Sequence, residues 1–254
     1  DSFAARVTAQ EADEIYEKEG KEIVRITAEE RNNFQLADAL VFPGQGFADI
    51  IRREFDLKQP YIVLPSYVPR RLYRYNIQDW LGGLVYEGKV QLNTEAKHSY
   101  GFRYCQYLEF AKKCREIGMD FHLYARDDDE FNKLYKDYAI LHQPELFNNL
   151  LKVIARHDWG LVGNIIPTTE WNIAFPNKLF EYIAVGVPVV AMNAKECGEF
   201  VECEGIGIAV KSVEELAERW SEHTEIRKIL MKKRAKYSMD NNIDKLVNFY
   251  DGLI

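Results

Sequence analysis

The segment FPNKLFEYIAVGVPVVA, residues 175–191, contains the side chains whose types and spacing could perform chemistry. Pro176 suits the first turn of a helix, where its missing N–H costs nothing and its fixed φ fits. The N-terminus of such a helix offers unpaired N–H groups and a partial positive charge, so an anion such as a diphosphate can bind there. Lys178 adds a full positive charge in the first turn. The segment therefore predicts an anion site.

Glu181 follows Lys178 at the i+3 spacing that places two side chains on one face of a helix. Its carboxylate could accept two hydrogen bonds from a ribose diol, so a phosphate contact and a sugar contact would share one turn. The alternative is a Lys–Glu pair on a solvated helix face. The apolar residues around the pair, and the Gly-Val-Pro run at 186–188 that leads into the next strand, favour a pair held at a sheet edge.

The strands and helices that must position Lys178 and Glu181 are predicted from about residue 79 onward. In this part of the chain, short apolar runs alternate with amphipathic stretches. That alternation is typical of repeated β-α units and predicts an α/β fold, a Rossmann-like parallel sheet with helices on both faces. The helix at 176–185 would begin at the carboxyl edge of the sheet, where open α/β sheets bind ligands. The expected strands are residues 83–86, 120–125, 138–141, 159–162, 187–192 and 207–210, and the expected covering helices include 100–117 and 145–155.

The two ends of the chain differ from this pattern. Residues 12–38 are predicted to be helical, and a single apolar run at 39–42, a helix at 46–55 and the stretch YIVLPSYVP follow them. We interpret this part as the helical remnant of an N-terminal domain and a connector. After residue 210 the pattern is helical: Ser212 begins a capping box with Glu215, and an amphipathic helix is expected at 242–250.

The composition excludes several classes of protein. At 254 residues, 47% hydrophobic and 29% charged, the chain is globular, and a net charge of −7 gives no long-range attraction for nucleic acid. Its apolar runs fall far short of the ~20 residues that a membrane helix needs. The spacing of the four cysteines matches neither a CxxC site nor a disulfide framework, which favours reduced thiols and a cytoplasmic location. Because the chain begins with Asp1 and has no signal-peptide pattern, we expect its start to be a cut.

The run PNKLFEYIAVGVPVVA resembles the signature of the large retaining glycosyltransferase family with the B-type fold, whose members use nucleotide-activated sugars. Other pieces resemble the family in the same order: ALVFPGQGFADII and IVLPSYVP the passage from acceptor to donor domain, LVYEGKV the first donor strand with its glycine loop, and HDWGLVG the strand before the signature. The resemblance covers roughly residues 31–254. It implies two facing Rossmann-like domains, of which this chain is the nucleotide-sugar-binding half.

The resemblance also implies a division of the chain. Residues 1–60 would be a remnant of the acceptor domain with a connector, 61–235 the donor-binding domain and 236–254 a C-terminal helix. A missing N-terminal domain or a partner chain would supply the site for an unidentified acceptor. That missing domain could hold the protein at the periphery of the inner membrane, although no transmembrane segment is expected.

Several donor-binding residues carry over from the family motif by position. Glu181 matches the ribose-binding glutamate, and the stretch Pro176, Asn177 and Lys178 faces the donor diphosphate. Gly88 and Lys89 match the loop where a small residue lets the backbone approach the phosphates and a basic residue neutralises them.

The sequence departs from the family at Ile173, where the usual motif has a second glutamate that contacts the donor sugar. Glu170 and Asn172 flank this position, and either could reach the sugar from a shifted loop. The loop containing Gln143 and Pro144 is expected beside the base. No catalytic residue is assigned.

The sequence thus predicts a donor domain that binds a nucleotide-diphosphate sugar for transfer to an acceptor, with retention. Helix N–H groups and lysines would stabilise the leaving diphosphate, so neither a cofactor nor a metal is expected. Two alternatives remain: a non-catalytic sugar-nucleotide-binding module, which fits Ile173, and a nucleotide-sugar epimerase of similar fold. A dehydrogenase is disfavoured because no GxGxxG follows any expected strand.

Overall fold

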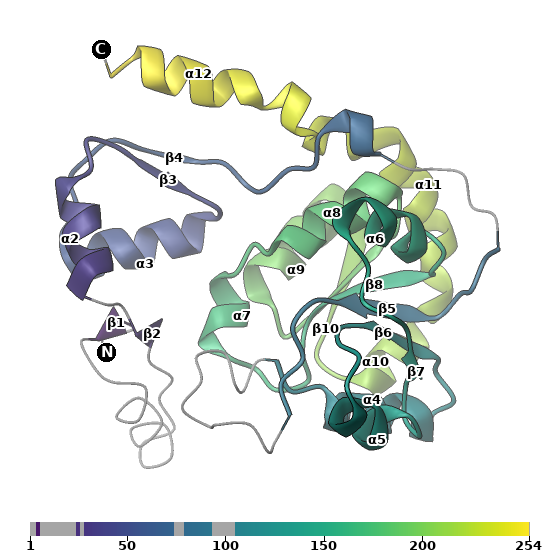
Figure 1. Cartoon of the computed structure of the whole chain (residues 1–254). Helices are drawn as coiled ribbons and strands as arrows, with labels where there is room; N and C mark the ends of the chain where they lie inside the picture. Colours follow the sequence, from purple (N-terminus) through teal and green to yellow (C-terminus); the bar gives the residue numbers. More distant parts are fainter. Residues whose placement is uncertain (1–3, 6–23, 26–27, 74–78, 93–104, 254) are drawn as a thin grey trace.

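The computed structural model describes residues 4–5, 24–25, 28–73, 79–92 and 105–253 of the chain. Its centre is a six-stranded sheet in which all neighbouring strands are parallel (Figure 1). The strands predicted from the sequence are all confirmed, with ends that shift by at most two residues. In spatial order they are β10 (Gly207–Val210), β9 (Val189–Met192), β8 (Trp159–Gly163), β5 (Leu84–Glu87), β6 (Phe121–Tyr124) and β7 (Ile140–Leu141).

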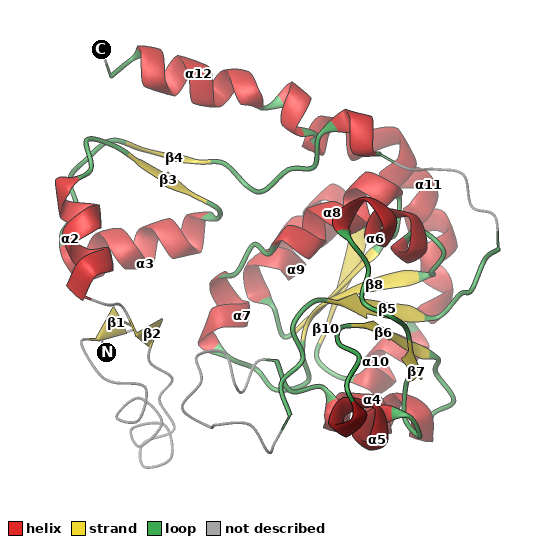
Figure 2. Ribbon diagram, in the orientation of Figure 1, coloured by secondary structure: helices red, strands yellow, loops and turns green. Residues whose placement is uncertain are grey.

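Helices cover both faces of this sheet, as Figure 2 shows, and the predicted fold class is confirmed. The helices α6 (Phe147–Ile154), α8 (Asn177–Val185) and α9 (Lys195–Glu204) contribute buried side chains to one hydrophobic core. A second core receives side chains from α4 (Leu108–Glu116), α5 (Asp129–Tyr135) and α10 (Val213–Glu218). Because side chains alternate along a strand, Leu84 and Tyr86 of β5 belong to the second core and Val85 to the first.

The remaining elements of the donor side are short or follow the sheet. They are η1 (Arg70–Leu72), α7 (Thr169–Ile173), η2 (Trp220–Glu222), α11 (His223–Lys233), η3 (Arg234–Tyr237), η4 (Met239–Asn241) and α12 (Ile243–Asp251). The predicted cap of α10 is present: the Ser212 hydroxyl accepts a hydrogen bond from the Glu215 N–H, and the Glu215 carboxylate accepts one from the Lys211 N–H. Within the described residues, no helix is long and apolar enough to cross a membrane.

The helix that carries the predicted anion site begins one residue later than expected. Pro176 has φ −73° and ψ 155°, which is extended backbone, so it is the residue before the helix and Asn177 is the first helical residue. At the other end, Gly186 has φ +76° and its N–H bonds to the carbonyl groups of Ile183 and Tyr182. This left-handed glycine cap is the predicted one, and it turns the chain directly into β9.

The part before the donor sheet is an α/β unit rather than a helical remnant. In this N-terminal unit, residues 28–63, α2 (Ala28–Leu36) leads to β3 (Leu40–Phe42), α3 (Gln45–Phe55) and β4 (Tyr61–Val63), and β3 pairs in parallel with β4. The prediction of one helix over 12–38 is wrong at β2 (Val24–Arg25), which pairs with β1 (Ala4–Ala5). Residues 12–23, 26–27 and 100–104, which belonged to expected helices, lie outside the described residues.

Contacts cross both of the expected domain boundaries, and the division itself stays a prediction. At residues 61–63, β4 pairs with β3 of the N-terminal unit. Beyond residue 235, Tyr237 is buried in the core beneath α8 and α9. The C-terminal helix α12 extends away from the donor domain, across the top of Figure 1.

The N-terminal unit contacts the donor domain through α7 and α9. Ile173 of α7 packs against the small apolar core of the unit. The Glu196 carboxylate, in the first turn of α9, accepts a hydrogen bond from the Gly46 N–H of α3. A Cβ atom on Gly46 would lie 1.8 Å from Glu196 Oε1, so only glycine permits this approach.

Packing of α8 on the sheet predicts the effect of one small substitution. A Cβ atom on Gly160 of β8 would lie 2.4 Å from the Tyr182 ring of α8. Gly160→Ala should therefore lower the free energy of unfolding by about 1–3 kcal/mol, the usual range for overpacking. Denaturant unfolding measures it, and Gly252→Ala, whose added Cβ would come no closer than 3.4 Å to any neighbour, is the control with an expected change below about 0.5 kcal/mol. Equal effects of both substitutions would contradict the packing argument.

Candidate functional site

The order of the strands reverses between β5 and β8, which are neighbours in the sheet although residues 88–158 separate them in the chain. Such a switch point opens a crevice at the carboxyl ends of the strands, because the two following connections leave on opposite sides. Here the connection after β5 begins with Gly88 and Lys89, and the connection after β8 leads to the N-terminus of α8. The two segments singled out in the sequence therefore meet at one edge.

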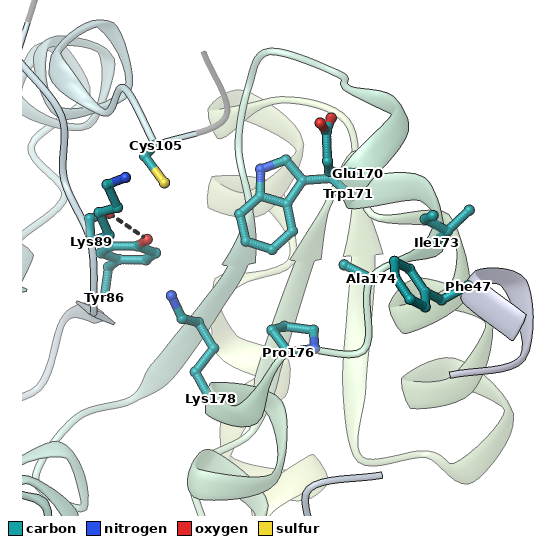
Figure 3. Close-up of a pocket in the computed structure, with 10 residues that line it drawn as sticks. All are labelled: Phe47, Tyr86, Lys89, Cys105, Glu170, Trp171, Ile173, Ala174, Pro176 and Lys178. Carbon is teal, nitrogen blue, oxygen red and sulfur yellow. Dashed lines mark hydrogen bonds between the residues drawn. The ribbon is translucent and has the colours of Figure 1, made fainter. Parts of the chain in front are cut away.

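A cavity of about 320 Å³ lies at this edge, shown in Figure 3. It is walled mainly by apolar and aromatic side chains, with three charged groups among them. Its floor and sides come from β5, the segment 170–178 and α3 of the N-terminal unit. The lining residues are Phe47, Tyr86, Lys89, Cys105, Glu170, Trp171, Ile173, Ala174, Pro176 and Lys178.

Lys178 is held against the end of β5 rather than in solvent. Its Nζ atom lies 3.9 Å from the centre of the Tyr86 ring, a cation–π contact. Burial opposes the charge, but Tyr86 and the Glu87 carboxyl outweigh it and raise the pKa of Lys178. The lysine is therefore positively charged at neutral pH, at the helix end where an anion would add favourable interactions.

Gly88 allows Lys178 to come this close. Its φ of +116° is in the region that favours glycine, and a Cβ atom there would lie 2.9 Å from Lys178 Nζ. The Tyr86 hydroxyl donates a 2.9 Å hydrogen bond to the Lys89 carbonyl, which fixes the loop that follows. Gly88 and the two lysines thus lie together at one end of the cavity.

Glu181 is buried, and the carboxyl group of Glu87, at the end of β5, is its neighbour. Burial and the neighbouring Glu87 carboxyl raise the pKa of Glu181 to about 8, although Lys178 opposes the shift. Lys178 and Glu181 are therefore not a Lys–Glu pair on a solvated helix face, which was the alternative interpretation. Glu87 was missed in the sequence because nothing in its local spacing relates the end of β5 to α8.

The structure brings together only part of the predicted site. Pro176, Lys178, Lys89 and Glu170 line the cavity, with Gly88 and Glu181 adjacent to them. Sequence reasoning missed four lining residues, whose contribution depends on contacts between segments far apart in the chain: Phe47, Tyr86, Cys105 and Ala174.

The other predicted residues lie elsewhere. Asn177 is exposed on the first turn of α8. Asn172 lines a different cavity, of about 350 Å³, together with Lys195. Gln143 and Pro144 are exposed in the loop after β7. Their contacts with the donor stay predictions.

Ile173 of α7, where the sequence departs from the family motif, has apolar surroundings. Ile173 lines the cavity and also packs on the core of the N-terminal unit, so an apolar side chain suits both surroundings. Trp171 is 5% exposed and belongs to the core beneath α8. It lines the cavity as well.

Three histidines form a buried cluster away from this cavity. His122 Nδ1 lies 2.9 Å from His142 Nε2, and His157 Nδ1 lies 2.7 Å from the Gly82 carbonyl. Burial, with the neighbouring imidazoles, lowers the pKa of His122 to about 4 and that of His157 to about 3. These side chains are neutral at pH 7, with His122 on β6 and the half-buried His142 and the buried His157 in the segments beside it. Among the described residues, no group of His, Cys, Asp and Glu side chains is arranged to hold a metal ion.

The sequence matches the family model described as "Glucosyltransferase 3-like, C-terminal domain" over residues 103–243. The chain belongs to this family. The match includes α8, with Lys178 and Glu181, but begins after the Gly88–Lys89 loop. No curated protein matches the sequence.

Solved structures of glycosyltransferases have the same fold. Sucrose-phosphate synthase from Thermosynechococcus elongatus superposes with a TM-score of 0.64 at 13% identity, over 88% of this chain and 60% of that one. HepE from Anabaena, in complex with UDP and glucose, gives 0.61 at 11% identity, over 89% and 68%. The GtfA/B complex gives 0.58 at 14% identity, over 89% and 47%. The chain spans less than two thirds of the first and third of these.

The approach of Lys178 to Gly88 predicts the consequence of filling that space. Gly88→Ala places a methyl group on the lysine and strains the loop by about 1–2 kcal/mol, the usual penalty of a left-handed L residue. The ammonium should move into solvent, so acetylation of Lys178, followed by mass spectrometry, should become faster. Gly118→Ala, which has a φ of +71° but nothing within 4 Å of the added Cβ, carries the backbone strain alone and should leave that rate as it is. Unchanged acetylation in Gly88→Ala would contradict the assigned contact.

Proposed function

We propose that this chain binds a nucleoside-diphosphate sugar at the β5–β8 switch point and serves as the donor domain of a glycosyltransferase. The observation that carries the proposal is the convergence of the α8 N-terminus, Lys178 and the Gly88–Lys89 loop at the edge where parallel sheets bind ligands. Two lysines and a helix dipole provide the positive potential that a diphosphate requires. Glu181, one turn further, provides an acceptor for a ribose diol.

Family membership and the solved structures support the same ligand class. The HepE structures contain UDP, with glucose or as UDP-glucose. In this chain the diphosphate would lie against Lys178 and Lys89, and the sugar would enter the cavity toward Trp171 and Glu170. An aromatic wall with a few polar groups is the usual composition of a site for a small organic ligand.

Transfer of the sugar, with retention, is the reaction we propose for the complete enzyme. Positive groups at the α8 N-terminus would stabilise the charge that develops on the departing diphosphate. This chemistry needs no metal or cofactor. The acceptor would approach over Phe47 of the N-terminal unit, and a further domain or a partner chain in the cytoplasm would provide the rest of its site.

Ile173 favours a second candidate function. Where the family motif has a sugar-contacting glutamate, an apolar side chain packs against the N-terminal unit. A domain that binds nucleotide sugars without transferring them would tolerate this change. Incubation with a nucleotide sugar and candidate acceptors distinguishes the two functions, because only the first releases a nucleoside diphosphate.

Calorimetry with UDP, GDP, ADP and dTDP tests the binding proposal. At least one of these should bind, and Lys178→Met should weaken that binding on the order of tenfold or more, because a charge-assisted contact to phosphate contributes about 1.5–3 kcal/mol. Lys228→Met, which changes an exposed lysine on α11, should have no effect on affinity. The proposal fails if none of the four binds at millimolar concentration to the folded protein.

Substitution of Glu181 tests the ribose contact. At pH 9, above the raised pKa of Glu181, Glu181→Gln keeps the shape of the side chain and removes its charge, so donor binding should weaken by about 1.5–3 kcal/mol, or roughly ten- to a hundredfold. A 2′-deoxy nucleotide, which lacks one of the hydroxyls, should lose much less on the same substitution. Thermal unfolding verifies that the variant is folded. An unaltered affinity in a folded variant would show that Glu181 does not contact the ribose.

A further inference from the structure

The cavity at the β5–β8 switch point has a charged end. Lys89 and Lys178 line it there, and the ammonium of Lys178 lies 3.9 Å from the centre of the Tyr86 ring. Two lysines and the N-terminus of α8 favour negative charge, so the phosphates of a ligand belong at this end. The cavity volume of about 320 Å³ is at the lower end of the range for small-molecule sites. Beyond the phosphates, the cavity therefore suits a single sugar ring.

The opposite end of the cavity is formed by three side chains that we call the apolar wall: Phe47, Ile173 and Ala174. Figure 3 shows them on one side of the Trp171 indole, with the charged end on the other side. Phe47 of α3 and Ile173 of α7 also pack against the core of the N-terminal unit. The apolar wall is therefore a packed surface that belongs to both the unit and the donor domain.

The side chains of the apolar wall consist of carbon and hydrogen alone, so they cannot donate or accept a hydrogen bond. A sugar hydroxyl against this wall would lose its hydrogen bonds to water and gain none from the three side chains, which is unfavourable. A methyl group in the same place would be removed from water, which is favourable. Both effects favour a sugar that presents a methyl group to the apolar wall.

We propose that the donor sugar carries a methyl group that packs against Phe47, Ile173 and Ala174. Two kinds of sugar provide one: a 6-deoxyhexose, through C6, and an N-acetylhexosamine, through its acetamido group. With the diphosphate at the charged end, the sugar ring that follows it lies along Trp171 and directs a substituent at the apolar wall. Glu170 also lines the cavity, where its carboxylate can accept hydrogen bonds from the remaining hydroxyl groups. This inference rests on the proposed function and specifies its substrate class.

Binding of matched donors tests the proposal. The probes are glucose, 6-deoxyglucose and N-acetylglucosamine, each attached to the nucleoside diphosphate that binds tightest in calorimetry. The three donors are otherwise the same, so a difference in dissociation constant reports the substituent. One of the two methyl-bearing donors should bind about ten- to a hundredfold more tightly than the glucose donor, the range over which apolar pockets discriminate such groups. The preferred donor identifies which methyl group meets the wall.

A matched pair of substitutions at position 173 tests whether the wall causes this preference. Ile173→Val and Ile173→Thr shorten the side chain alike, but only threonine adds a hydroxyl group. Because that hydroxyl can pair with a hydroxyl of the sugar, the preference should fall about two- to tenfold in Ile173→Thr and persist in Ile173→Val. The affinity for the nucleoside diphosphate without a sugar should be the same in both variants.

Two further variants separate the wall from general effects of substitution. Ala174→Ser adds a hydroxyl group to the wall with little change in volume and should also lower the preference, so the test stands even if Ile173→Thr does not fold. Val247→Thr adds a hydroxyl group on α12, where the side chain is 48% exposed, and should leave the preference as it is. Thermal unfolding verifies that each variant is folded.

Equal affinity for the three donors, or tighter binding of the glucose donor, would overturn the proposal and leave the proposed function intact. A preference that persists unchanged in both Ile173→Thr and Ala174→Ser would overturn it too, because the methyl group would then lie elsewhere. If neither the nucleoside diphosphates nor the donors bind to the folded protein, the proposed function fails, and this inference fails with it.

Discussion

The close packing of α8 against β5 and β8 is the constraint on which the rest of the structure depends. From Leu179 to Val185 every residue of this helix is buried, so the helix has no solvated face after its first turn. Glycine at 160 leaves room for the Tyr182 ring, whose hydroxyl donates to the Val85 carbonyl. Because α8 is packed so tightly, its N-terminal N–H groups are held in a fixed position at the switch point. The polar side chains on it must then find partners inside the protein.

The charged side chains at this edge of the sheet include one lysine and two glutamates. Lys178 faces Tyr86 and the cavity, and the carboxyl groups of Glu87 and Glu181 are neighbours of each other and of the lysine. A buried charge is tolerated only when it is paired or neutralised. The lysine meets an aromatic face and a carboxyl, and the second carboxyl is accommodated by its contact with the first. The result is a positively charged side chain at the cavity beside two neighbouring carboxyl groups.

The N-terminal unit completes the cavity and accounts for the unusual residue at its rim. Phe47 of α3 lines the cavity from the N-terminal unit. Ile173, from the donor domain, lines the cavity as well and packs on the core of that unit. The Glu196 carboxylate fixes the start of α3 through the Gly46 N–H. An apolar residue at 173 therefore strengthens the contact between unit and domain at the position where the family motif has a charged contact to the sugar.

Local patterns in the sequence determined the strands and α8, because apolar runs, the capping glycine at 186 and the i+3 spacing of Lys178 and Glu181 depend only on near neighbours. The resemblance to the glycosyltransferase family added the Gly88–Lys89 loop. Tertiary structure alone decided that Glu87 meets Glu181, since the pairing of β5 with β8 joins segments that are far apart in the chain. It likewise brought Phe47 to the cavity and placed Asn172 in another one, because strand order and the packing of separate units leave no trace in local spacing.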